Sequence, residues 1–132
     1  MMRYGDHINK EYALRILIFI VILLAALVGL LNPKPPPALF PHIGFVLHCI
    51  GFATLSLATR IAFRHCPAQW LWTILLCCAP LAEFLQLLQP LRSFSRTDIY
   101  ANLLGVALAA LLWFVYTYLK RRWQPNTMYT NH

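Results

Sequence analysis

Five strongly polar side chains interrupt segments that are otherwise apolar, and these residues could carry chemistry: His48, Glu83, Gln86, Asp98 and Asn102. A histidine and two carboxylates can exchange protons or hold a polar ligand. Inside a membrane an ionised group costs of the order of 3 kcal/mol, so such groups are kept where they face a neighbour or a water-filled cleft. Glu83 and Gln86 are three residues apart, a spacing that places both on one helix face.

Asp98 begins a second polar face. Asn102 lies four residues further on, and the same spacing continues to Gly105 and Ala109. Two small residues four apart form an edge at which another helix can approach closely. We therefore predict that Gly105 and Ala109 serve helix packing beneath a polar pair.

The segment between these two faces carries Arg92 and Arg96, followed by Asp98. Ser95 and Asp98 fit a capping box, with Ser95 as the N-cap of the next helix, so capping is one interpretation of Asp98. Arg92 is either a ligand-binding arginine or a loop charge paired with Asp98 or Glu83. The sequence leaves these alternatives open.

The other polar residues also have structural interpretations. His48 alone in a helix could be a hydrogen-bonded packing residue, and Gln86 and Asn102 could join helices. Glu83 is the hardest to explain in this way, because a carboxylate within an apolar segment needs a partner or a proton. The predicted catalytic candidates are His48, Glu83 and Asp98.

The composition of the chain indicates the fold that holds these polar residues in place. Of the 132 residues, 60% are hydrophobic and 11% are charged, whereas a soluble domain is about half apolar and a quarter charged. So small a globule cannot bury that much apolar surface. The sequence predicts an all-α membrane protein: a single-domain bundle of four transmembrane helices covering residues 1–132.

The predicted spans cover approximately residues 12–31, 40–63, 69–88 and 99–119. A run of four prolines within residues 33–37 ends the first span, since proline lacks the amide donor. Pro80 lies inside the third span, where we expect it to kink the helix.

The basic residues predict the orientation. Three segments on one side of the membrane hold eight Lys and Arg: Arg3, Lys10, Arg15, Arg60, Arg64, Lys120, Arg121 and Arg122. The other side holds three: Lys34, Arg92 and Arg96. Positive residues favour the cytoplasmic side, so both termini are predicted to be cytoplasmic. The charges lie between apolar runs, which explains the net charge of +7 without a nucleic-acid partner.

This topology brings the five polar residues to one level. The second and fourth spans begin outside and the third ends there, so all five are expected at the outer-leaflet end of the bundle.

The four cysteines lack metal-ligand spacing, and no metal or cofactor is expected.

The same residues resemble the signature of the VanZ-like family. The resemblance covers roughly residues 44–112 and rests on a histidine motif in the second span and a longer motif across the third and fourth: His48, Gly51, Phe52, Glu83, Gln86, Arg92, Ser93, Phe94, Ser95, Asp98, Asn102 and Gly105. That family consists of small multi-spanning membrane proteins, and its name-giving member is associated with resistance to the glycopeptide teicoplanin. The resemblance departs at Gly44 and Phe45, where the family often carries an Asp-Lys pair.

Three functions from different classes follow. The first is a binding protein of the cell envelope, whose outward cleft holds a membrane lipid, a lipid-linked cell-wall precursor or a glycopeptide. Its predicted ligand-binding residues are His48, Glu83, Gln86, Arg92, Ser95, Asp98 and Asn102. The second is an intramembrane enzyme acting on an envelope lipid. The third is a structural subunit of a membrane complex, and homo-oligomerisation is left open.

Overall fold

The computed structural model describes residues 4–32, 41–90 and 92–123, with side chains from residue 9 onward. These residues form four helices and no strands: α1 (Tyr4–Leu31), α2 (Ile43–Ala62), α3 (Ala68–Gln86) and α4 (Arg96–Trp123). Each helix is long and apolar enough to cross a membrane. The prediction of an all-α protein with four potential membrane spans is confirmed.

The helix ends differ from the predicted spans by a few residues, for local reasons. The third span was predicted to reach Leu88, but α3 ends at Gln86 and the backbone turns there, with the Leu88 N–H donating to the Leu85 carbonyl (3.2 Å). Helix α4 begins earlier than its apolar stretch because Ser95 caps it. Helix α3 continues through Pro80. Both Phe40 and the proline run lie outside the described residues.

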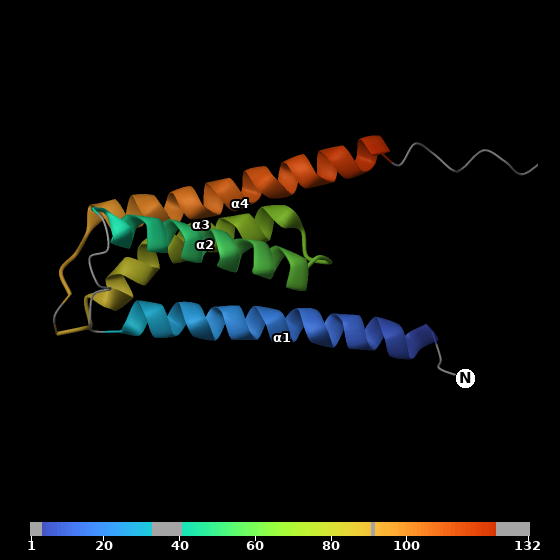
Figure 1. The fold of residues 1–132 in the computed structure, drawn as a ribbon, viewed down its shortest axis with the longest axis horizontal. Coiled ribbons are helices and arrows are strands. Elements are labelled where there is room, and N and C mark those ends of the chain that lie inside the picture. The colour runs from blue at the N-terminus through green and yellow to red at the C-terminus, as the bar shows by residue number, and fades with distance from the viewer. Residues whose placement is uncertain (1–3, 33–40, 91, 124–132) are drawn as a thin grey trace, which may run out of the picture.

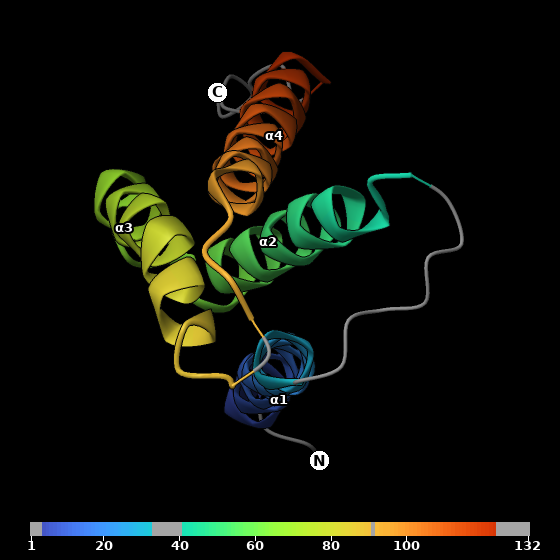
Figure 2. The ribbon, with the colours of Figure 1, turned by 90° about the vertical axis from the view of Figure 1, so that its left-hand side faces the viewer.

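The four helices run side by side (Figure 1). Seen end-on, α1 and α4 lie on opposite sides of the bundle with α2 and α3 between them (Figure 2). Helix α2 packs most extensively along α4 and also contacts α1, whereas α1 and α4 do not touch along their described lengths. The contact between α2 and α4 is therefore the main helix interface of the bundle.

The interface between α2 and α4 is tight because its buried residues are small. Most of the buried apolar residues are alanines, including Ala58 of α2 and Ala101 and Ala109 of α4. A Cβ atom placed on Gly105 would collide with the Cys49 carbonyl of α2. The predicted packing edge of Gly105 and Ala109 is thus found where α4 meets α2, as expected for helices that associate through small side chains.

Helix α1 is attached more loosely. No residue of its apolar stretch, Asn9–Leu31, is buried in the bundle. Large side chains such as Val28 (68% exposed) point away from the other helices. Lipid must cover most of this surface. The side chains of α1 and α2 are not closely packed against each other, so a space remains between the two helices.

The bundle has two distinct ends. The loop end comprises the end of α1, the start of α2, and residues 87–90 and 92–95 between α3 and α4. The terminal end comprises the start of α1, residues 63–67 between α2 and α3, and the end of α4 (Figure 1). The first residue of α1 and the last of α4 thus lie at the same end, as an even number of spans requires.

Candidate functional site

A cavity of about 540 Å³ opens at the loop end between α1 and α2, bordered by the end of α3 and the start of α4. Its volume is typical of a small-molecule site. Most of its wall is apolar and comes from α1 and α2: Ile22, Ala25, Ala26, Gly29, Leu30, Gly44, Leu47, Gly51, Phe52 and Leu55. Asn32 and Thr54 also line the cavity, as do four predicted site residues: His48, Gln86, Arg92 and Asp98.

His48 is held in one orientation by α4. Its Nδ1 lies 2.9 Å from the Asn102 Oδ1, and the Asn102 amide nitrogen donates to the Ala79 carbonyl (3.1 Å). A backbone carbonyl can only accept, so Oδ1 of Asn102 must face the histidine. Nδ1 of His48 therefore carries a hydrogen and donates to Asn102, which leaves Nε2 as the ring nitrogen available to another partner.

Nε2 of His48 faces Asp98, with 3.9 Å between Nε2 and Oδ2. The two side chains are mostly buried, at 14% and 21% exposed. Both side chains line the cavity, so the pair presents polar atoms at its wall.

Glu83 is almost fully buried (1% exposed) and caps α4 from the neighbouring helix. Its Oε1 accepts the backbone N–H of Ser95 at 2.7 Å, while the Ser95 hydroxyl accepts the Asp98 N–H at 3.2 Å. In a standard capping box the side chain at the Asp98 position would accept the N-cap amide. Ser95 is thus the N-cap, as predicted, but α3 supplies the second acceptor.

This arrangement leaves Asp98 free to turn toward His48. It also places a carboxylate at the N-terminus of α4, where the helix dipole favours negative charge. The second oxygen of Glu83, Oε2, is buried without a hydrogen-bond partner.

Two of the lining residues connect α1 to the site. The Gln86 amide donates to the Leu30 carbonyl at 3.4 Å, and the Arg92 guanidinium donates to the Asn32 carbonyl at 3.5 Å. The alternative in which Arg92 pairs with Asp98 or Glu83 is not found among the ion pairs of the described residues. Nε of Arg92 is buried without a hydrogen-bond partner, so this arginine still has a donor for an incoming acceptor.

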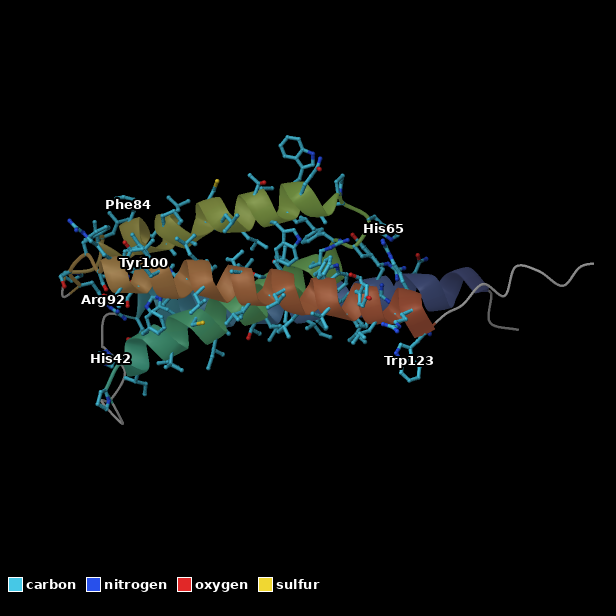
Figure 3. The ribbon with its side chains drawn as sticks, turned by 90° about the horizontal axis from the view of Figure 1, so that it is seen from above. His42, His65, Phe84, Arg92, Tyr100 and Trp123 are labelled. Atoms are coloured by element: carbon cyan, nitrogen blue, oxygen red, sulfur yellow. The ribbon has the colours of Figure 1, made fainter. Side chains whose placement is uncertain are left out.

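The structure thus separates the seven predicted ligand-binding residues into two groups. His48, Gln86, Arg92 and Asp98 line the cavity. Glu83, Ser95 and Asn102 lie behind it and contact either a lining residue or the first turn of α4. Arg96 is exposed and does not line the cavity, although Arg92 does (Figure 3 shows Arg92 at the loop end).

Sequence reasoning missed the contribution of α1. The small residues Ala25, Ala26 and Gly29 form part of the cavity wall. Their spacing of three and four residues places them on one face of α1, and that pattern was the signal available in the sequence.

The arrangement suits binding or proton transfer at one polar end of an apolar cavity. Among the residues that the structure describes, no three His, Cys, Asp or Glu side chains are close enough to hold a metal ion. No family model matches the chain, and neither a curated protein nor a solved structure matches it.

Proposed function

We propose that this chain is a VanZ-like multi-pass protein of the cytoplasmic membrane that binds an envelope lipid in the cavity at its loop end. One observation carries the proposal: the cavity is amphipathic along its length. Its polar residues Gln86, Arg92 and Asp98 gather at the loop end, and its deeper wall, at Ile22 and Leu55, is apolar. A lipid has the same division between headgroup and chain.

The headgroup would be polar and carry an acceptor such as a phosphate. Arg92 offers an unpartnered buried Nε, and arginine donates to phosphate oxygens in a fixed fork. The nitrogen Nε2 of His48 and the carboxylate of Asp98 can accept from hydroxyl or amide groups of the same headgroup. A lipid-linked cell-wall precursor combines these features.

The distribution of basic residues supports an outward position for this cavity. Among the residues that the structure describes, seven Lys and Arg lie at the terminal end and two at the loop end. By the positive-inside rule the termini are cytoplasmic and the loop end faces outward. A protein that holds wall precursors there would change the access of a glycopeptide such as teicoplanin to its target, which is the role that the family resemblance implies.

Photocrosslinking tests the ligand. A benzophenone side chain would replace Leu47, which lines the cavity and is 48% exposed, and in a control it would replace Leu81. Leu81 is 52% exposed on α3 and lies outside the cavity lining. After irradiation in cells, mass spectrometry should find a phosphate-bearing lipid attached at Leu47 in excess over Leu81. Equal capture of the same bulk lipids at both positions would refute the proposal.

Cysteine labelling tests the orientation. Ser93 is exposed at the loop end, and native Cys66 is exposed at the terminal end, so each end offers a reporter. One variant would keep Cys66 as its single cysteine, and a second would carry only Ser93→Cys. A membrane-impermeant thiol reagent added to intact cells, with any outer membrane permeabilised, should label Ser93→Cys and leave Cys66 unlabelled. The reverse pattern would place the cavity on the cytoplasmic side.

The tautomer of His48 favours a second candidate, an intramembrane enzyme acting on the same lipid. With Nδ1 donating to Asn102 and Nε2 facing Asp98, the imidazole could act as a general base. The variant His48→Gln retains hydrogen bonding but cannot serve as that base. Chemical change of the captured lipid by the native protein, lost in His48→Gln while capture persists, would establish the enzyme. An unchanged lipid would leave binding as the function.

A further inference from the structure

A second cavity, of about 780 Å³, lies at the terminal end between α1, α2 and α4. Figure 3 shows His65, one of its residues, at the opposite end of the bundle from Arg92. Its lining combines basic, aromatic and aliphatic side chains: Arg15, Leu57, Arg60, Ile61, Arg64, His65, Leu112, Trp113, Tyr116, Thr117 and Lys120. No part of it belongs to the site described above.

Three of the four basic residues of this cavity have no acidic partner among the described residues. Arg15, Arg60, Arg64 and Lys120 line it, and no Asp or Glu of the described chain does. Glu11 accepts from Arg15 at 3.1 Å but is 69% exposed and outside the lining. The C-terminal dipoles of α2 and α4 each contribute only about half a negative charge. The cavity therefore keeps a surplus of positive charge that an anion would stabilise.

Arg60 is already held in place for an acceptor. Its guanidinium stacks on Trp113, with 5.0 Å between Cζ and the ring centroid, and one terminal nitrogen donates to the Phe63 carbonyl at 3.3 Å. Its Nε is buried with no hydrogen-bond partner. A buried donor without an acceptor is unfavourable, and a ligand that supplies the acceptor gains from a side chain that is already ordered.

The chemistry that fits is a phosphate attached to an apolar chain. Arginine forks match phosphate oxygens, and the aliphatic side chains Leu57, Ile61 and Leu112 continue the wall toward the middle of the bundle. Basic pockets between helices at the membrane surface are typical sites for anionic lipid headgroups. We propose that the terminal-end cavity binds the headgroup of an anionic phospholipid from the leaflet that faces the termini. This site does not depend on a ligand in the loop-end cavity.

Lipid titration of the purified full-length protein in neutral detergent tests this proposal. Phosphatidylglycerol would be compared with phosphatidylcholine and with inorganic phosphate, with the midpoint of thermal unfolding as one readout. Native mass spectrometry would count the lipids that remain bound. Phosphatidylglycerol should raise the midpoint with saturation, and the other two should not. An equal rise with inorganic phosphate would assign a free-phosphate site instead, and an equal rise with phosphatidylcholine would overturn the proposal.

Two double variants separate a built site from general surface charge. Arg60→Gln with Arg64→Gln removes two cations of the cavity, and Arg121→Gln with Arg122→Gln removes two exposed cations of the same end that do not line it. The first pair should weaken phosphatidylglycerol binding by about tenfold or more, and the control pair by about threefold or less. Equal losses would overturn the proposal.

A third variant covers the case in which loss of the Arg60–Trp113 contact prevents folding. Arg64→Gln with Lys120→Gln leaves that contact intact and still removes two lining cations. It should weaken binding by about tenfold as well. Unchanged affinity for phosphatidylglycerol in this variant would refute the site.

Discussion

Substituting Gly105 by alanine should destabilise the protein although alanine is the better helix former. Its Cβ would collide with the Cys49 carbonyl and lie 2.9 Å from the Ala53 nitrogen, both backbone atoms of α2 that cannot move alone. Overpacking of this kind costs about 1–3 kcal/mol. The gain in helix propensity is about 1 kcal/mol, so the net loss reaches about 2 kcal/mol.

Gly51 of α2 provides the matched control, because a Cβ there would meet no heavy atom within 4 Å. Gly51→Ala should gain the same helix propensity, about 1 kcal/mol, without overpacking. The propensity term cancels between the two variants, so their difference of about 1–3 kcal/mol isolates the approach of α4 to α2.

Reversible unfolding in mixed detergent micelles, followed by far-UV circular dichroism, measures this difference. The variant Gly105→Ala should also reduce ligand capture at Leu47, because separating α2 from α4 lengthens the bond between His48 and Asn102, one turn from Gly105. Equal stability of the two alanine variants would refute the inference that α2 and α4 are in contact at Gly105.

The remaining predictions use the same unfolding and capture measurements. Glu83→Ala leaves the Ser95 amide without its acceptor and should cost about 1–3 kcal/mol, whereas the exposed Glu11→Gln should cost no more than about 0.5 kcal/mol. Indistinguishable values would show that Glu83 does not cap α4. Ser95→Ala removes the side-chain cap and should cost about 1 kcal/mol, with Ser95→Thr as the variant that preserves it. Gly44→Leu fills the loop-end cavity from a position with open space around it and should lower capture at Leu47 by about tenfold with stability unchanged. Undiminished capture would place the ligand elsewhere.

The four spans could be predicted from the sequence, and so could the shared level of the polar residues at the loop end. Both follow from the pattern within each helix and from the alternating direction of successive helices. Hydropathy locates the spans, and spacings of three and four place Asp98 above Asn102 on one face. Alternating direction along the chain then brings His48 of α2 to the same level. The bond between His48 and Asn102 is consistent with this prediction.

Features that depend on how two helices are rotated against each other could not be predicted. The local sequence pairs Ser95 with Asp98 in a capping box. Because α3 packs against the start of α4, Glu83 supplies the acceptor for the Ser95 amide instead. From the sequence, the basic residues of the terminal end indicate only the orientation of the helices. The position of Arg60 over Trp113 depends on the α2–α4 contact, which no pattern within one helix specifies.

The bond from Glu83 to the first turn of α4 has a consequence for biosynthesis. When α3 leaves the ribosome, the carboxylate of Glu83 has no partner. Glu83 lies in the last turn of α3, so its insertion costs part of the about 3 kcal/mol that an acidic group at a helix centre costs. The Ser95 amide follows only twelve residues later, on the segment that begins α4. We therefore expect α3 and α4 to enter the bilayer together as a helical hairpin, so that a chain truncated before Ser95 would insert α3 less efficiently than the full chain.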